Sequence, residues 1–311
     1  MARIGTTDLD VLPLVLGGNV FGWTCDERES YAVLDAFAAA GTGMVDTADV
    51  YSAWAPGNSG GESEEILGRW MAARGNRDRV VVATKVGKLP GLTGLSPDTI
   101  RIACENSLRR LQTDVIDLFY AHADDGSVPL QETLGAFDLL VREGKVRYVG
   151  ASNFSADRLA GALAVSDRDG LVRYAALQQH YNLVERAGYE GATADVVARE
   201  GLASLPYYGL ASGFLSGKYR RGTPVDSVRS GGAAAYLEGD RGVRVLAALE
   251  QVAQVHGVSM ATVALGWLLA QPTVAAPIAS ARTPEQLADL LAVCTLELSA
   301  DELVELDRAS A

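Results

Sequence analysis

Four polar side chains interrupt or end apolar, strand-like runs in the first half of the chain. Asp46 follows Gly-Met-Val, Lys85 ends the run VVVATK, and His122 follows IDLFYA. Tyr51 comes shortly after Asp46, in the segment that would form the next loop. Because a polar group at the end of a buried strand is partly desolvated, we expect shifted pKa values at these positions.

The four residues together would form a proton donor. A phenol has a pKa of about 10 and is a poor acid at neutral pH. An ammonium at Lys85 is expected to favour the phenolate of Tyr51 and to lower the pKa of the phenol toward the working range. Asp46 would keep the lysine charged, and a neutral imidazole at position 122 would orient a substrate oxygen. This chemistry suits the reduction of a carbonyl group, with hydride delivered to carbon and a proton from the phenol to oxygen.

Each of these residues alone has an ordinary structural explanation. A carboxylate can cap a strand end, a lysine stem can pack on the rim of a sheet, and a single histidine is more often structural than catalytic. Their joint placement at strand ends favours the catalytic interpretation.

The elements that must position these side chains alternate along the chain. Short apolar runs predict parallel strands covered on both faces, at residues 11–16, 43–46, 80–85, 116–122, 146–151, 175–178, 202–206 and 274–277. Apolar stripes predict helices over 132–141, 245–255 and 261–269. Helix starts are indicated at Ser96 and Thr283, each followed by proline, and capping-box spacing links Thr283 with Gln286 and Ser299 with Glu302.

About eight strand-then-helix units predict an α/β fold, a (β/α)8 TIM barrel formed by residues 1–311 as one domain. A doubly wound open sheet is the alternative. It is disfavoured because the first strand is followed by LGGNVFG and not by the G-x-G-x-x-G of a dinucleotide fold. Two long loops, 49–63 and 220–241, are expected on the C-terminal face of the barrel, where such loops are often functional.

Composition narrows the function classes further. The 311 residues carry a net charge of −12, which argues against a nucleic-acid or membrane partner. The three cysteines, Cys25, Cys104 and Cys294, are far apart and there is no histidine cluster, so neither a disulfide framework nor a metal site is expected. The first residues contain no apolar signal segment, and we expect a cytoplasmic protein. The oligomeric state stays open.

At the four polar residues the sequence resembles the aldo-keto reductase superfamily. The segments that carry the resemblance are DTADVY (46–51), VVATKVG (81–87), DLFYAHADD (117–125), GKVRYVGASNF (144–154), LQQHYNLVER (177–186), LPYYGLASGFLSGKY (205–219) and SARTPEQL (280–287). They follow one another in the family's order and cover nearly the entire chain.

The resemblance implies an NADPH-dependent oxidoreductase that uses neither metal nor flavin and acts on a small carbonyl substrate. It makes Tyr51 the general acid, Asp46 and Lys85 its tuning pair, and His122 the group that orients the carbonyl. The same resemblance implies cofactor-binding roles for Ser152, Asn153, Gln178, Tyr207, Leu210, Ser212, Gly213, Ser216, Lys218, Arg229, Ser280, Arg282, Gln286 and Asp289. Within this set Tyr207 would stack on the nicotinamide, Lys218 would balance the pyrophosphate, and Arg282 would bind the adenosine 2′-phosphate. Phe21, Trp23 and Trp54 are candidates for the substrate wall.

Several positions depart from the family pattern. Ser52 replaces the glycine that usually follows the catalytic tyrosine, and Tyr208-Gly209 replaces a Ser-Pro. Leu290 stands where an asparagine commonly contacts adenine, and the neighbouring Asp289 adds negative charge. These departures affect the expected cofactor preference more than the expected reaction.

Two other functions fit parts of the pattern. One is a nicotinamide-binding regulatory or scaffold protein with little turnover. The other is a barrel enzyme of another kind, such as an isomerase or an aldolase that forms a Schiff base through Lys85. For a reductase, a sugar aldehyde, a keto-sugar, a dicarbonyl and a xenobiotic aldehyde all remain open as substrates.

Overall fold

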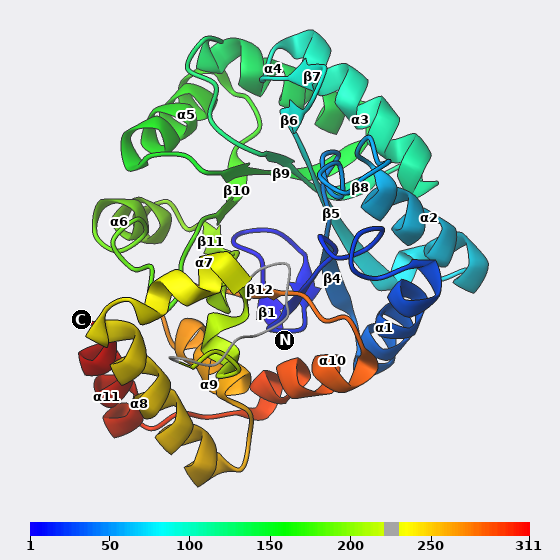
Figure 1. The fold of residues 1–311 in the computed structure, drawn as a ribbon. Helices are drawn as coiled ribbons and strands as arrows, with labels where there is room; N and C mark the ends of the chain where they lie inside the picture. Colours follow the sequence, from blue (N-terminus) through cyan, green and yellow to red (C-terminus); the bar gives the residue numbers. More distant parts are fainter. Residues whose placement is uncertain (221–229) are drawn as a thin grey trace.

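Eight of the strands form one parallel sheet that curls into a ring (Figure 1). The computed structural model describes residues 1–220 and 230–311. In the order in which they pair, the strands are β11 (Ala203–Ser204), β10 (Tyr174–Gln178), β9 (Val146–Ser152), β8 (Ile116–Ala121), β5 (Val80–Val86), β4 (Gly43–Asp46), β3 (Val15–Gly17) and β12 (Ile278–Ala279). All neighbouring pairs are parallel, as the prediction of a (β/α)8 barrel requires.

The ring closes through the segment that leads into β12. Ser204 donates its backbone N–H to the carbonyl of Thr273 at 2.9 Å, and Ile278 donates to the carbonyl of Pro206 at 2.8 Å. On the other edge, β12 pairs with β3 in parallel register. The predicted strand over 274–277 therefore lies in the barrel wall, but the regular strand begins at Ile278 because these last hydrogen bonds are irregularly spaced.

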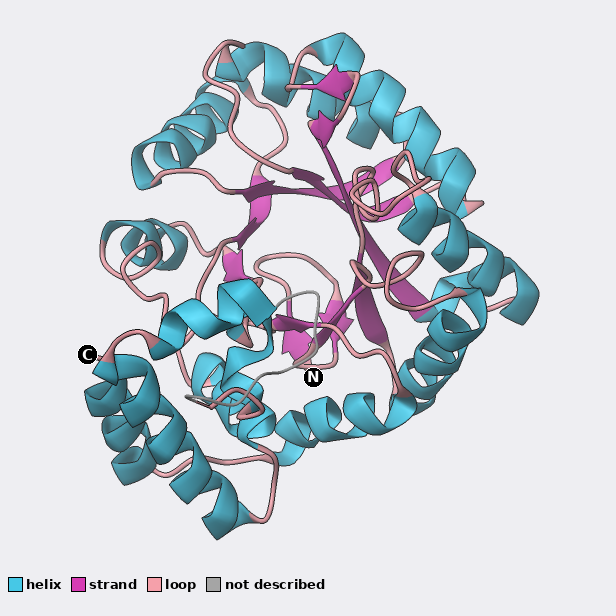
Figure 2. Ribbon diagram, in the orientation of Figure 1, coloured by secondary structure: helices cyan, strands magenta, loops and turns pink. Residues whose placement is uncertain are grey.

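Helices surround the ring (Figure 2). They are α1 (Glu27–Ala40), α2 (Glu62–Arg74), α3 (Pro97–Leu111), α4 (Leu130–Arg142), α5 (Ala156–Asp169), α6 (Ala192–Arg199), α7 (Ser230–Ala234), α8 (Asp240–His256), α9 (Met260–Leu269), α10 (Pro284–Leu291) and α11 (Ala300–Ser310). No single helix among the described residues is long and apolar enough to cross a bilayer; α8 and α9 pass that test only as a pair, and they meet at a bend of 97°.

The barrel interior is filled by small and branched apolar side chains. Val15, Met44 and Leu118 point inward from three different strands and are fully buried. An antiparallel hairpin, β1 (Ala2–Arg3) with β2 (Asp10–Val11), carries further members of this core, including Val11. The first predicted strand, 11–16, is thus divided: Pro13 has no N–H to continue a ladder, and the barrel strand starts only at Val15.

The predicted helix starts are largely confirmed. Ser96 and Thr283 accept hydrogen bonds from the third residue of their helices, and Ser299 with Glu302 forms a complete capping box. The expected loop over 220–241 is wrong in part, because α7 and the start of α8 lie within it.

Candidate active site

The four predicted catalytic residues come together at the C-terminal end of the barrel. Asp46 is the last residue of β4, Lys85 lies near the end of β5, and His122 follows β8. The Lys85 ammonium donates to Asp46 Oδ2 at 2.7 Å and to the Tyr51 hydroxyl at 2.9 Å. The hydroxyl of Tyr51 in turn donates to Asp46 Oδ2 at 3.2 Å.

Lys85 is held from every side. Its third hydrogen bond goes to the carbonyl of Thr47 at 2.8 Å, and its side chain is fully buried. It does not line the cavity described below. A Schiff base would require this amine to lose its proton and reach a substrate, so the structure disfavours that alternative.

The expectation that the pKa of the Tyr51 phenol is lowered is wrong. Burial, and then the negative charge of Asp46, raise the pKa of Tyr51 well above its ordinary value. Burial also lowers the pKa of Lys85, against the opposing effect of Asp46. The sequence predicted a cation beside the phenol, but the stronger desolvation of the hydroxyl follows only from the tertiary packing around that group.

His122 is a neutral imidazole at the cavity wall. Burial lowers its pKa well below the ordinary value, and the charges of Lys85 and Lys88 act in the same direction. Its Nδ1 is buried and has no hydrogen-bond partner among the described residues. The other ring nitrogen, Nε2, is therefore the atom left to contact a ligand.

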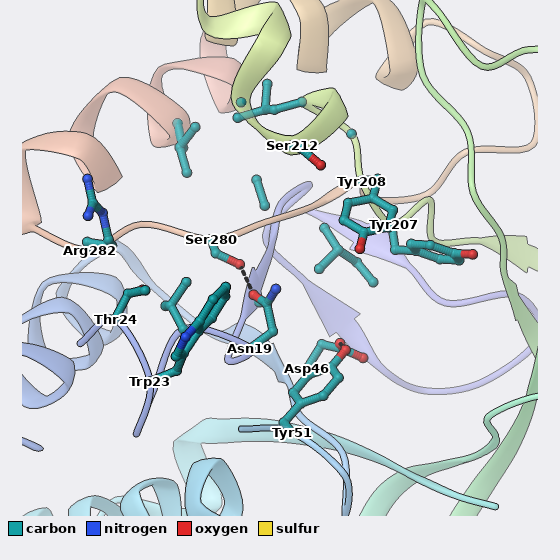
Figure 3. Close-up of a pocket in the computed structure, with 18 of the residues that line it drawn as sticks. Asn19, Trp23, Thr24, Asp46, Tyr51, Tyr207, Tyr208, Ser212, Ser280 and Arg282 are labelled. Atoms are coloured by element: carbon teal, nitrogen blue, oxygen red, sulfur yellow. Dashed lines mark hydrogen bonds between the residues drawn. The ribbon is translucent and has the colours of Figure 1, made fainter. Parts of the chain in front are cut away.

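A cavity of about 970 Å³ opens above the four residues. Figure 3 shows Tyr51 and Asp46 on one side of it, next to Asn19, with Arg282 on the opposite side from Tyr207. All of the predicted cofactor residues that can be placed line this cavity, namely Ser152, Asn153, Gln178, Tyr207, Leu210, Ser212, Gly213, Ser216, Lys218, Ser280, Arg282, Gln286 and Asp289. Arg229 lies outside the described residues.

We call the four predicted catalytic residues, Asp46, Tyr51, Lys85 and His122, the tetrad. The amide side chains next to the tetrad form hydrogen bonds with other protein groups. Asn153 donates to the carbonyl of His122 at 2.9 Å and accepts from the Tyr207 hydroxyl at 2.7 Å. Gln178 donates to Asp46 Oδ1 at 2.8 Å. The amide of Gln178 therefore positions the carboxylate of the tetrad in addition to facing the cavity.

The Arg282 end of the cavity is fixed by the start of α10. Thr283 caps the helix, but the expected reciprocal bond from Gln286 goes elsewhere: its side-chain oxygen accepts from the backbone N–H of Arg282 at 3.0 Å. This contact holds the backbone of Arg282 at a helix N-terminus, a position that favours anions.

Strained backbone is concentrated around the cavity. In the described chain six non-glycine residues have positive φ, and five of them, Ser52, Asn153, Tyr208, Ala211 and Ser212, lie in or next to its lining segments. Ser52, at φ 71°, occupies the position where the family usually has glycine, and its hydroxyl donates to the carbonyl of Phe21 at 2.7 Å. Such strain persists only where the surroundings over-determine it, and it gathers at functional sites.

Two of the three residues predicted for the substrate wall lie at the cavity. Trp23 and Trp54 line the cavity, and their rings meet edge to face at 5.6 Å. Phe21 does not line it: its side chain is fully buried in the core between the barrel and its helices, so that assignment was wrong. In an irregular loop, spacing gives no rule for which of two nearby aromatic residues faces inward.

Other lining residues escaped the sequence reasoning. Asn19 accepts a hydrogen bond from the hydroxyl of Ser280 at 2.5 Å (Figure 3), and Tyr208 and Lys88 also face the cavity. Lys88 comes shortly after the strand that carries Lys85. The rule that polar residues at strand ends face the site would therefore also have indicated Lys88.

Comparison with known proteins settles the family. The chain matches the model of the Aldo/keto reductase family over residues 13–311. The chain belongs to this family. It is 32% identical to "Protein tas" of Escherichia coli (strain K12), over 98% of this chain and 96% of that protein. It is 34% identical to "Uncharacterized oxidoreductase YrpG" of Bacillus subtilis (strain 168), over 96% and 92% of the two chains.

This aldo-keto reductase also has a relative with a different kind of name. It is 33% identical to "Probable voltage-gated potassium channel subunit beta" of Oryza sativa subsp. japonica, over 97% of this chain and 94% of that protein. Family membership and the oxidoreductase relatives together support an oxidoreductase.

Proposed function

We propose that this aldo-keto reductase uses NADPH to reduce an aldehyde or ketone to an alcohol, with Tyr51 as the general acid. The observation that carries the proposal is the hydrogen-bonded set of Tyr51, Lys85 and Asp46 at the edge of the cavity. A phenol, a buried cation and a carboxylate within hydrogen-bond distance are suited to one proton transfer to a carbonyl oxygen.

The cavity suits a dinucleotide. Three consecutive residues, Ala211, Ser212 and Gly213, have positive φ, and such turned backbone presents N–H groups to an anion. A Cβ placed on Gly213 would lie 3.4 Å from Lys218 Nζ, so the ammonium lies directly over this turn. We assign the pyrophosphate to this turn and to Lys218, and the nicotinamide to the face of Tyr207.

Bound NADPH would supply the hydrogen and the electron pair that the carbonyl carbon accepts. Tyr51 gives its proton to the carbonyl oxygen as the new C–H bond forms. The raised pKa of the phenol is compatible with this step, because an alkoxide is a far stronger base than a phenolate. The Lys85 ammonium, 2.9 Å from the phenol oxygen, stabilises the phenolate that remains. Neutral His122 donates a hydrogen bond to the same carbonyl oxygen and fixes its direction.

Arg282 supports NADPH over NADH in this proposal. Its guanidinium makes no ion pair within the described part of the chain, and it lines the cavity beside the N-terminus of α10. Asp289 lines the same end and opposes a phosphate, so the preference depends on which of the two side chains meets the 2′ position.

A regulatory protein that binds the cofactor with little turnover is the second candidate. The relative named as a probable channel subunit favours it. The hydrogen-bonded set of Tyr51, Lys85 and Asp46 argues against it, since a protein that only binds the cofactor needs no proton donor.

The deciding experiment follows the consumption of NADPH and of NADH across a panel of aldehydes and ketones. We expect turnover with several carbonyl compounds and a kcat/KM at least about 10-fold higher with NADPH, as one charge-assisted phosphate contact would give. Binding of NADPH without consumption in any member of the panel would instead support the regulatory candidate.

A further inference from the structure

Lys88 is a cation placed in the cavity by a short hairpin. It lines the cavity and begins β6 (Lys88–Leu89), which pairs with β7 (Leu92–Thr93). Gly87, at φ 114°, turns the chain away from β5, and a Cβ there would approach the carbonyl oxygen of Gly94 at 3.2 Å. The turn therefore requires glycine, and it holds the start of the hairpin close to the end of the strand that carries Lys85.

No carboxylate of the described residues forms an ion pair with Lys88. Among those residues, the ionisable groups that interact electrostatically with it are the cation of Lys85 and the neutral imidazole of His122. Burial and the charge of Lys85 lower the pKa of Lys88, and Lys88 helps to lower that of His122. Asp125, the acid next to this hairpin, accepts instead from the backbone of Leu95 and from Ser127. The side chain of Lys88 is exposed where it lines the cavity, so its ammonium can meet an anion that enters the cavity from solvent.

Lysine is a rare residue in this chain, with four in total. Lys85 belongs to the tetrad, Lys218 lies over the Gly213 turn, and Lys145 pairs with Glu105 and Glu143 on the surface. Arginines, and His256 with Glu302, supply the remaining ion pairs of the described chain. Lys88 is thus the lysine for which neither the fold nor the proposed cofactor site provides a partner.

We propose that Lys88 binds an oxygen anion on the substrate, so that the enzyme prefers carbonyl compounds that carry a carboxylate or a phosphate. The inference rests on the proposed function and specifies its substrate class. The carbonyl lies between Tyr51 and His122, the body of the substrate packs against Trp23 and Trp54, and the anion reaches the Lys88 ammonium. This division leaves Lys218 and Arg282 to the cofactor at the other end of the cavity.

The test compares three aldehydes of similar shape: para-carboxybenzaldehyde, para-formylphenyl phosphate and the neutral methyl para-formylbenzoate. With saturating NADPH we expect kcat/KM for at least one anionic aldehyde to exceed that for the ester by about 10-fold or more. An effect of this size lies between the contributions that an exposed and a buried ion pair make to binding. Lys88→Met should abolish this preference and leave the rate with the ester within about twofold. The two anionic substrates distinguish a carboxylate site from a phosphate site.

Matched variants separate local from general charge effects. Lys145→Met removes the same charge far from the cavity and should keep the preference, and Lys88→Arg should keep part of it. Equal rates with all three aldehydes in the wild type would overturn the inference but not the proposed function. A similar loss with all three in Lys88→Met would also overturn it, since Lys88 would then act through His122 or the fold.

A binding measurement keeps the inference testable without turnover. Calorimetry with para-hydroxymethylbenzoate, the carboxylated product, should show affinity that falls about 10-fold in Lys88→Met, while para-hydroxymethylbenzamide should bind both proteins alike. Unchanged affinity for the carboxylate would refute the anion site. Binding as expected, with no carbonyl reduced, would leave the anion site in place and reject the proposed reaction.

Discussion

The two ends of the barrel use the same residue types for opposite purposes. At the N-terminal end Asp117 accepts hydrogen bonds from Arg77 at 2.8 Å, from Arg147 at 2.8 Å and from the backbone of Val82 at 2.9 Å. At the C-terminal end Asp46 also pairs with a cation, but that cation contacts a phenol at the edge of a cavity.

Among the carboxylates and imidazoles of the described residues, the buried atoms without a hydrogen-bond partner lie at the C-terminal end, whereas at the N-terminal end the amide oxygen of Asn76 is buried without one. Arg77 also donates to the carbonyls of Val80 and Val115. The groups around Asp117 at the N-terminal end therefore form their hydrogen bonds with one another. Near the tetrad, both carboxyl oxygens of Asp49 and the Nδ1 of His122 are buried with no partner among the described residues. Burial, together with Glu64, raises the pKa of Asp49 to about 7. Closed polar networks stabilise a barrel, whereas unpaired groups and strained backbone mark the end that acts on ligands.

Lys85→Met gives the largest expected effect, because it damages both stability and activity. The buried carboxylate of Asp46 would lose its cation, which costs about 3–5 kcal/mol of unfolding free energy. Carbonyl reduction should fall by about 100-fold or more, since the phenolate is no longer stabilised. Chemical denaturation and steady-state kinetics on the same preparation check both parts; a variant with wild-type kcat would contradict the role of the pair.

Asp117→Ala should separate the two ends. It leaves Arg77 and Arg147 without their shared partner and should lower the unfolding free energy by about 2–4 kcal/mol. Since no reacting group lies at this end, kcat and KM of the folded enzyme should stay within about twofold of wild type. A stable variant that loses activity would show that the ends are coupled.

Arg282→Ala sharpens the comparison within the cavity. Loss of one phosphate contact should raise KM for NADPH by about 10-fold and change KM for NADH by less than about twofold. Arg101→Ala serves as control, because that exposed arginine pairs only with Asp98 in the described chain. An equal rise of both KM values in Arg282→Ala would remove the basis for the NADPH preference.

The smallest expected effect is that of pH. Imidazole is neutral above the lowered pKa of His122, and the phenol keeps its proton below the raised pKa of Tyr51. Neutral His122 and protonated Tyr51 are therefore both present over the whole pH interval between the ordinary pKa values of imidazole, about 6.5, and phenol, about 10, and beyond it. Reduction should be nearly independent of pH from about 7 to 9, with only a minor step from Asp49; a steep limb in that interval, in kcat measured at saturating substrate, would argue against these assignments.

The tetrad could be predicted because strand ends of a parallel barrel meet at one edge, which is a rule of topology. Helix caps could be predicted at Ser96 and Ser299 because their hydrogen bonds are local in sequence. The direction of the pKa shift at Tyr51 could not be predicted, since it depends on how far the tertiary structure removes the hydroxyl from solvent. Phe21 was misplaced for a related reason: its orientation is set by loop packing and not by a strand or helix period.

Tyr51→Phe tests the central claim most directly, because it removes a single oxygen and leaves Lys85 and Asp46 paired. We predict that the rate of carbonyl reduction in a single turnover falls by about 10²- to 10⁴-fold, while the dissociation constant for NADPH, measured by quenching of tryptophan fluorescence, stays within about twofold. A variant that binds NADPH normally and reduces the carbonyl at close to the wild-type rate would contradict the assignment of Tyr51 as the proton donor.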